Sequence, residues 1–310
     1  MFTAALIFII GFIIAISNLI VRSDISISLS IDSEYIILGH SHPECAFNDS
    51  LIEKVENISK SGESYFYTYF KAKKIIEDNI QVNTVFIEFE NQQIDKESGD
   101  AWIFSDASIS NMFSKYSPFM NISDYILLLL ENSKAVLNSQ SIATMRNIEF
   151  LINNEAFKAQ SWGGYKFLVR DKTDSLISVM PRVNVKQKSD FEISKINIEY
   201  LEKIIAFCKS KGVNVYFIRS PLHAKYEGLI NERKFMEIYN ERFENIKFLD
   251  FKDYPLHNWE FGDLSHLNYK GAKEFSIFFN QLLIRKLLHV DTPQVMINKE
   301  IEIRKKEKGV

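Results

Sequence analysis

The sequence predicts an α/β protein with a mostly parallel sheet that helices cover on both faces. Three short apolar segments carry this prediction, at residues 35–38 (YIIL), 84–89 (TVFIEF) and 213–218 (VNVYFI). Each is separated from the next by segments with helical spacing of apolar residues, and this alternation is typical of parallel strands joined by crossover helices. A fourth strand is expected at 246–251 (IKFLDF), and a short one at 56–59 (ENIS).

Residues 2–21 form an uncharged apolar run (FTAALIFIIGFIIAISNLIV). A helix of about 20 residues, rising about 1.5 Å per residue, matches a hydrocarbon core of about 30 Å. No basic residue precedes the run and no Ala-x-Ala cleavage motif follows it, as would be typical of a signal peptide. The pattern favours an uncleaved anchor at 1–23, followed by a Ser-rich spacer at 24–33; a cleaved signal peptide and a buried helix are the alternatives.

The α/β domain is expected at residues 34–289. Between about 95 and 190 the strand-helix alternation stops, which predicts a mostly helical insertion with an amphipathic helix near 138–153. The polar residues 290–310 predict an exposed, partly disordered tail. The other expected helices are at about 48–58, 65–78, 196–212 (ending at Gly212), 229–243 and 268–288 (capped by Asn268).

Composition excludes several classes of protein. The net charge is −3, without the basic face that a nucleic-acid-binding protein needs. The two cysteines, Cys45 and Cys208, lack the spacing of a zinc site and are too few for a disulfide framework. A single bridge between them is the disfavoured alternative.

Polar side chains gather just after the predicted strands. In doubly wound sheets, ligands bind outside the carboxyl ends of the strands, so these positions are candidates for a functional site. They are Gly39, His40, Ser41 and His42 after the first strand, Gly62 after the short second one, Glu90 and Asn91 after the third, Arg219 and His223 after the fourth, and Asp263 and His266 after the last.

The residue types suit acyl transfer through a serine. A serine hydroxyl is a weak nucleophile that needs a base, and the base needs a third group to orient it. Ser41 is the candidate nucleophile, His266 the candidate base, and Asp263, three residues before it, the candidate orienting carboxylate. The backbone N–H groups of Ser41 and Gly62, with the Asn91 amide, are the candidates for an oxyanion hole.

Structural alternatives remain open for these residues. Ser41 is also a suitable cap for the helix after the first strand. His266 bonded to Asp263 is also a stable structural pair, and Asn91 is also a common turn residue.

Four more residues are expected to line a substrate pocket: His40, His42, Arg219 and His223. His40 and His42 flank Ser41 on its own turn, which Gly39 is expected to tighten, so neither is expected to be the base. Arg219 and His223 suit an anionic or sugar group, or else are solvated loop residues.

A metal site is the remaining alternative at these positions. His40 and His42, together with Asp263 and His266, form a set of ligands suited to zinc. The order Ser-Gly-Asn-Asp-His is accounted for without a metal, so no metal and no cofactor is expected.

The ordered set resembles the SGNH hydrolase superfamily, also called GDSL-like. In that family a Ser follows the first strand, a Gly the second and an Asn the third, and a late Asp-x-x-His completes the site. The resemblance covers about residues 34–91 and 195–285, and its strongest piece is DLSHLNYKGA. The matching positions are Ser41 (LGHSH), Gly62 (KSGES), Asn91 (FENQQ), Asp263 and His266.

The sequence departs from the family pattern at two places. His40 stands where the family usually has Asp before the nucleophile, and Glu88-Phe89-Glu90-Asn91-Gln92 stands where it usually has Gly-x-Asn-Asp. Either change bears on the oxyanion hole, or marks a relative with altered or lost activity.

The resemblance implies a three-layer, flavodoxin-type sheet and a serine esterase or O-acyltransferase. With the N-terminal anchor, the sequence looks like bacterial SGNH proteins that modify cell-surface polysaccharides. The expected partner is then an acylated carbohydrate or cell-envelope polymer, and the expected location is a single-pass membrane anchor with an extracytoplasmic catalytic domain. The alternative is a non-catalytic, membrane-tethered SGNH-like module that binds polysaccharide or scaffolds an export complex.

Overall fold

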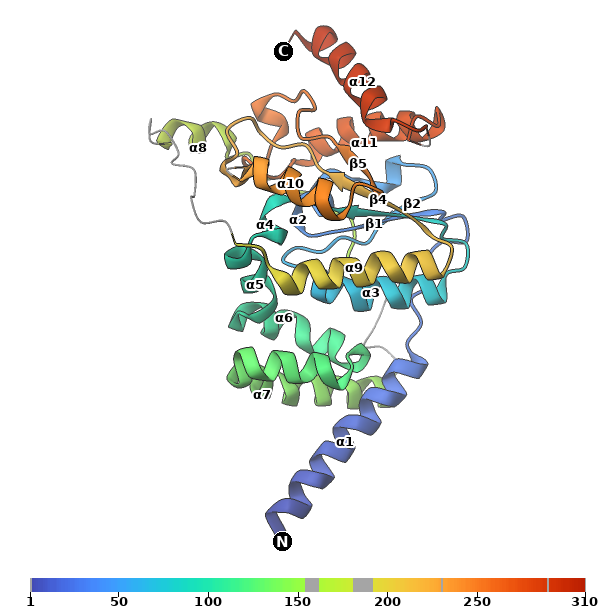
Figure 1. Cartoon of the computed structure of the whole chain (residues 1–310), viewed down its shortest axis with the longest axis vertical. Coiled ribbons are helices and arrows are strands. Elements are labelled where there is room, and N and C mark those ends of the chain that lie inside the picture. The colour runs from blue at the N-terminus through green and yellow to red at the C-terminus, as the bar shows by residue number, and fades with distance from the viewer. Residues whose placement is uncertain (1, 154–161, 181–191, 230, 289, 310) are drawn as a thin grey trace.

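A computed structural model describes residues 2–153, 162–180, 192–229, 231–288 and 290–309. Five parallel strands form one sheet in the order β2-β1-β3-β4-β5 (Figure 1). This confirms the predicted α/β class with a parallel sheet. Because β1 lies between β2 and β3, the winding reverses at β1 and β3, which is where doubly wound sheets bind ligands. The strands are β1 (Tyr35–Leu38), β2 (Val55–Asn57), β3 (Thr84–Glu88), β4 (Asn214–Arg219) and β5 (Lys247–Asp250).

Helices cover both faces of the sheet. Alternate strand residues point to opposite faces, so Ile36 and Leu38 join one hydrophobic cluster while Ile37 joins the other. Side chains of α3 (Tyr65–Asp78), α9 (Lys195–Ser210) and α10 (Glu232–Arg242) complete the first cluster. Side chains of α2 (Ser41–Ala46), α11 (Tyr269–Ile284) and α12 (Pro293–Lys308) complete the second.

A further helical layer lies outside α3, at the lower end of the molecule in Figure 1. The helix α7 bends at Asn132 (φ −152°), whose side-chain oxygen accepts from the Ala135 N–H at 3.1 Å. This layer is made of α5 (Lys96–Phe104), α6 (Asp106–Tyr116), α7 (Ile122–Asn153) and the N-terminal α1 (Phe2–Asp24). The remaining short elements are α4 (Asn91–Ile94), α8 (Thr173–Val179) and the 3₁₀ turns Asp49–Leu51, Ser117–Phe119, Glu227–Leu229 and Asn258–Glu260.

The helix α1 extends away from the body of the molecule in Figure 1 and packs against α7. Asn147 of α7 donates to the Asn18 side-chain oxygen at 2.6 Å, and Asn18 donates to the Tyr125 hydroxyl at 2.8 Å. Among the helices of the described residues, none combines the length and the apolar character that a membrane span requires. The expected anchor at 2–21 therefore stays a prediction.

The expected helix at 48–58 is wrong. Residues 49–51 instead form a 3₁₀ turn, and residues 55–57 form strand β2, which overlaps the short strand expected at 56–59. The Asn57 amide donates to the carbonyl oxygens of Pro43 and Phe47, both at 2.8 Å, and Val55 pairs with Tyr35. The backbone groups of this segment thus find their partners on α2 and β1. Helix propensity depends on neighbouring residues alone and does not predict such contacts.

The C-terminal segment also differs from the expected tail, because residues 293–308 form α12. Ile297 and Ile301, one turn apart, are buried in the core beside β5. The Gln294 side chain accepts from the Asp250 N–H at 2.8 Å and donates to the Asp250 carbonyl at 3.0 Å. The helix thus covers the exposed edge of β5, which would otherwise leave backbone groups unpaired.

Cys45 and Cys208 are both free and buried. Burial raises the pKa of each thiol to about 12, so both are protonated near neutral pH.

Candidate active site

Ser41 lies at the point where the winding of the sheet reverses. β1 ends at Leu38, Gly39 and His40 form the turn, and Ser41 is the first residue of α2. His40 occupies the N-cap position without a side-chain capping bond, so the structure does not use Ser41 as the helix cap. The Ser41 hydroxyl is instead engaged with histidine side chains.

Gly39 has a different role from the expected one, because its φ is not in the left-handed region. A Cβ atom added to Gly39 would lie 2.6 Å from Glu88 Cβ and 2.6 Å from Pro43 Cγ. Glycine therefore permits the close approach of Glu88, the last residue of β3, to the turn that carries Ser41.

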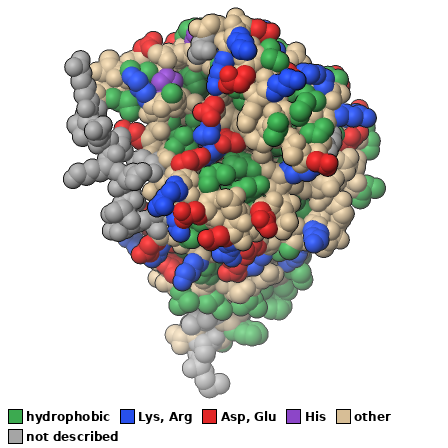
Figure 2. Space-filling view, turned by 45° about the horizontal axis from the view of Figure 1, so that its top comes forward, with side chains coloured by type: hydrophobic (Ala, Val, Ile, Leu, Met, Phe, Trp, Pro, Cys, Tyr) green, Lys and Arg blue, Asp and Glu red, His purple; other side chains and the backbone are tan. Residues whose placement is uncertain are grey.

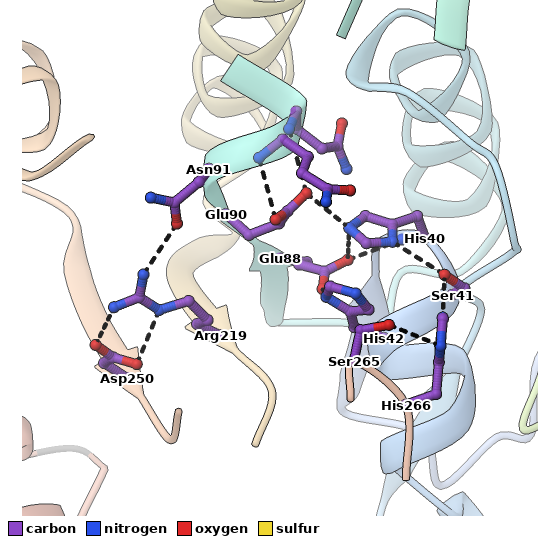
Figure 3. A network of polar contacts seen from close by, with 12 residues as sticks. His40, Ser41, His42, Glu88, Glu90, Asn91, Arg219, Asp250, Ser265 and His266 are labelled. Atoms are coloured by element: carbon purple, nitrogen blue, oxygen red, sulfur yellow. Dashed lines mark hydrogen bonds and ion pairs between the residues drawn. The ribbon is translucent and has the colours of Figure 1, made fainter. Parts of the chain in front are cut away.

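Ser41, His266 and Asp263 form one continuous hydrogen-bonded chain. The Oγ atom of Ser41 lies 2.7 Å from Nε2 of His266. On the other side of the ring, Nδ1 lies 2.9 Å from Oδ1 and 3.1 Å from Oδ2 of Asp263 (Ser41 and His266 are labelled in Figure 3). This is the order of contacts that a serine nucleophile, a base and an orienting carboxylate require.

Asp263 is held in place by several donors. The backbone N–H groups of Ser265 and His266 both donate to its Oδ1 atom at 2.9 Å, and Arg170 pairs with its Oδ2 atom. Burial raises the pKa of the Asp263 carboxyl, but the hydrogen bond and charge of His266 outweigh it and leave the pKa well below its usual range. Asp263 is therefore ionised at neutral pH and suited to hold the imidazole of His266.

Of the three expected oxyanion donors, one is the N–H of Ser41 itself, and a second, the Gly62 N–H, belongs to a turn that is joined to the Ser41 loop. Gly62 has a φ of +74°, which suits a glycine in a left-handed turn. That turn is tied to the Ser41 loop because the Lys60 N–H donates to the Gly39 carbonyl at 2.9 Å. The Ser41 N–H lies in the first turn of α2, where N–H groups have no partner within the helix.

The Asn91 amide is not placed at the expected oxyanion hole. Its nitrogen donates to Glu232 at 3.1 Å, and its oxygen accepts from Arg219 at 3.1 Å. Figure 3 shows the Asn91 side chain directed toward Arg219 and away from Ser41. The geometry thus does not support the oxyanion contribution expected for Asn91.

The burial of Arg219 does not support the substrate-binding role expected for it. Its guanidinium is fully buried and donates to both Glu232 and Asp250. Burial raises the pKa of Asp250, but the hydrogen bonds and charge of Arg219 outweigh it and lower the pKa below its ordinary value. These pairs hold β4, β5 and α10 together, so Arg219 is part of the framework beneath the site.

His40 and His42 are buried beside two carboxylates at the end of β3. His40 Nε2 lies 3.1 Å from Glu88 Oε2 and 3.1 Å from Glu90 Oε1, and His42 Nδ1 lies 3.4 Å from Glu88 Oε1. Burial lowers the pKa of His40, but Glu88 and Glu90 outweigh it and raise the pKa above its ordinary value. Burial and the charge of His40 lower the pKa of His42. The His42 ring also contacts the His266 ring, with 5.2 Å between their centroids.

Among the described residues, no hydrogen bond joins the His223 side chain to Ser41. Its Nε2 atom lies 3.0 Å from the Asn258 side-chain oxygen, and its Nδ1 atom accepts from the Lys225 N–H at 3.1 Å. The His223 backbone N–H donates to the Leu264 carbonyl at 3.1 Å, which fixes the loop that carries Asp263 and His266.

Two site residues were not assigned from the sequence, Arg170 and Glu88. Arg170 lies in a segment in which the Lys166 N–H donates to the Glu44 carbonyl at 2.7 Å. No local sequence pattern marks Arg170 as a site residue. Glu88 was noticed only as a departure from the family pattern. A charged residue directly after the apolar run 85–87 of a wholly buried strand is the feature that marks Glu88.

Comparisons with known proteins give little further information. The sequence model of an uncharacterised family matches residues 172–288, a segment that contains Asp263 and His266 but not Ser41. No curated protein matches the chain.

Proposed function

We propose that this protein is a serine esterase or O-acyltransferase of the SGNH type. The observation that carries the proposal is the chain of contacts from Ser41 Oγ to His266 Nε2 at 2.7 Å and from His266 Nδ1 to Asp263 Oδ1 at 2.9 Å. Its support is geometric, because a general base must be within hydrogen-bond reach of the proton that it removes.

The proposed reaction has two steps. Ser41 Oγ attacks an acyl ester carbonyl while His266 removes the hydroxyl proton, and the tetrahedral intermediate releases the alcohol with a proton from His266. Water or a sugar hydroxyl then attacks the acyl-serine with His266 as base, and Ser41 recovers its proton. The Ser41 and Gly62 N–H groups are the proposed oxyanion donors, and Asp263 keeps the His266 tautomer fixed.

The proposed substrate is an acylated carbohydrate or cell-envelope polymer. An open groove of about 590 Å³ has Trp102 in its wall. The Trp102 ring packs on the His40 ring at 4.8 Å between centroids. An indole beside carboxylate and amide groups suits a sugar, which presents an apolar ring face and hydroxyl groups. The polar residues of this groove are Asn91, Gln92, Asp95, Glu97, Ser98, Glu227 and Asn231.

We further propose that the protein is anchored to a membrane with an extracytoplasmic catalytic domain. Hydrophobic side chains gather at the lower end of the molecule in Figure 2, where α1 and α7 lie in Figure 1. Phe8 of α1 is 74% exposed and Leu130 of α7 is 80% exposed. Such a surface suits lipid contact. Carbonate extraction of membranes, with mass spectrometry of the N-terminus, tests the anchor; a soluble protein or a new terminus near residues 17–30 contradicts it.

A non-catalytic, membrane-tethered SGNH-like module is the second candidate function. The observation that favours it is the Asn91 amide, which pairs with Arg219 and Glu232 and leaves the proposed oxyanion hole with one donor fewer than the family pattern implies. Such a module would bind the same polysaccharide or scaffold an export complex without turning over esters.

A fluorophosphonate probe tests the proposed function. We expect the probe to label wild-type protein covalently and to leave Ser41→Ala and His266→Ala unlabelled. Ser141→Ala, which changes an exposed serine on α7, is the matched control and should label like wild type. An unlabelled wild type that also hydrolyses no acyl esters would favour the non-catalytic module.

A further inference from the structure

Three side chains at the carboxyl ends of β1 and β3 form a buried cluster that the proposed acyl transfer does not use. They are His40, His42 and Glu88, which are 1%, 3% and 0% exposed. Each of the three offers one possible ligand atom, a ring nitrogen or a carboxylate oxygen, and these three atoms lie within 4.8 Å of one another. We propose that this cluster binds a divalent transition-metal ion, with zinc as the best match. This site would exist whether or not Ser41 is a nucleophile.

Two spacings in the cluster lie close to those around a tetrahedral metal. Zinc bonds to histidine nitrogen and carboxylate oxygen are about 2.0–2.2 Å long, so neighbouring ligand atoms in a tetrahedron lie about 3.3–3.6 Å apart. His42 Nδ1 lies 3.4 Å from Glu88 Oε1, and His40 Nε2 lies 3.1 Å from Glu88 Oε2. The two distances run to different oxygens of Glu88, and the ligand atoms lie within 4.8 Å of one another, so binding one ion would require the side chains to rotate toward it.

Two atoms of the cluster lack a hydrogen-bond partner. Among the described residues, His42 Nδ1 and Glu88 Oε1 are fully buried and face each other without forming a hydrogen bond. Buried polar atoms are almost always satisfied, so two unsatisfied atoms 3.4 Å apart are candidate ligands of one ion. A metal between these two atoms would satisfy both.

The charges of the cluster also call for a cation. Glu90 is 1% exposed and adds a second buried carboxylate beside Glu88. In the part of the chain that the structure describes, the ion pairs of Glu88 and Glu90 are with histidines alone. Buried carboxylates are stable when they are paired with a cation or coordinate a metal. The two imidazoles and one carboxylate match the His₂Glu set of zinc sites, which keeps a fourth position open.

Glu90 is a neighbour of the proposed metal and not one of the three ligands. Its carboxylate accepts from the Gln92 and Gln93 N–H groups at 3.1 and 3.2 Å, which caps α4. The remaining contact, to His40 Nε2 at 3.1 Å, would pass to the metal if that nitrogen became a ligand.

The proposed site would also act on the turn that carries Ser41. The other ring nitrogen of His40, Nδ1, lies 3.4 Å from Ser41 Oγ. When one imidazole nitrogen binds a metal, the other carries the proton and donates to a neighbour. A metal on His40 Nε2 would therefore direct an N–H group at the Ser41 hydroxyl.

Zinc stoichiometry of the purified full chain tests the site directly. The protein is stripped with a chelator, incubated with equimolar ZnCl₂, desalted and analysed by elemental mass spectrometry. We expect about one zinc per chain, which equal amounts of Mg²⁺ or Ca²⁺ do not displace because those ions prefer all-oxygen ligands. Glu88→Gln and His42→Ala should each weaken zinc binding at least ~10-fold.

Two control variants separate this site from the proposed function. Ser41→Ala should lose probe labelling and keep its zinc, and His257→Asn, which changes a histidine outside the cluster, should keep both. Wild-type protein that retains less than about a tenth of a zinc per chain overturns the site, whatever the variants do. Equal zinc in wild type and in folded Glu88→Gln overturns it as well, while zinc binding without probe labelling would leave the site intact and reject only the acyl-transfer proposal.

Discussion

The Nε2 atom of His266 lies 2.7 Å from the Oγ atom of Ser41, although 225 residues separate them in the chain. Ser41 begins the first helix after β1, and His266 lies in the loop before α11. The parallel sheet brings the two together because both follow strands whose carboxyl ends share one edge.

The carboxylate of Asp263 should matter for turnover more than for binding. Asp263→Asn removes the charge that favours the His266 tautomer with a proton on Nδ1, so we expect kcat to fall by about 10³–10⁴-fold with a small change in KM. Steady-state hydrolysis of a p-nitrophenyl ester measures both constants. Arg170→Gln, which removes a neighbour of Asp263 and leaves the carboxylate, should cost less than about 10-fold. Equal losses for the two variants would mean that the carboxylate has no special role.

Asn91 should contribute to stability and not to the oxyanion hole. Asn91→Ala removes hydrogen bonds to Arg219 and Glu232, so we expect a loss of about 1–2 kcal/mol in the free energy of unfolding. We expect kcat to stay within about 10-fold of wild type, since a lost oxyanion donor typically costs about 10²–10³-fold. Urea unfolding and ester hydrolysis check the two expectations. A loss of about 10²-fold or more in a stably folded variant would restore Asn91 to the oxyanion hole.

Gly39 should tolerate no side chain. In Gly39→Ala the new Cβ would lie 2.6 Å from Glu88 Cβ and from Pro43 Cγ, so we expect a destabilisation of about 1–3 kcal/mol. Denaturant unfolding with a tryptophan fluorescence readout measures this change. Gly11→Ala is the control, because nothing lies within 4 Å of its added Cβ and alanine favours a helix. Equal stability of wild type and Gly39→Ala would show that the turn can move away from Glu88.

Lys115 should make stability depend on pH. Burial beside Trp162 lowers the pKa of its ammonium group from 10.5 to about 6. Between these two values the unfolded chain binds a proton that the folded chain releases, so the free energy of unfolding rises with pH. Lys115 therefore destabilises the folded protein most below about pH 6, and this penalty disappears above about pH 10.5, the pKa in the unfolded chain.

Lys115→Met removes this titration while keeping an unbranched side chain of similar length. We expect the stability difference, wild type minus Lys115→Met, to rise by about 1 kcal/mol per pH unit between roughly pH 7 and pH 9. Urea unfolding at several pH values measures it. A difference that stays constant across this range would mean that Lys115 remains charged in the folded protein.

The sequence by itself determined the parts of this protein that depend on local patterns. The strands at 35–38, 84–89, 213–218 and 246–251 were located because short apolar segments between polar ones need only neighbouring residues to be recognised. Gly212 ends its helix with a φ of +72°, as a C-terminal glycine predicts. The set of Ser41, Asp263 and His266 was also found from the sequence, because Ser41 closely follows β1 and the other two lie in the polar loop between β5 and α11.

Only the tertiary structure decided where the side chains of the site point and what they contact. Glu88 turns onto His40 and His42 because Gly39 leaves space for it, and Asn91 turns away because the buried Arg219 needs its oxygen. These partners are far apart in the chain, and a buried charge takes whichever counter-charge the packing brings near it. The same reason explains why the helix expected at 48–58 does not form, since its last residues pair with β1 as strand β2, close to the short strand expected at 56–59.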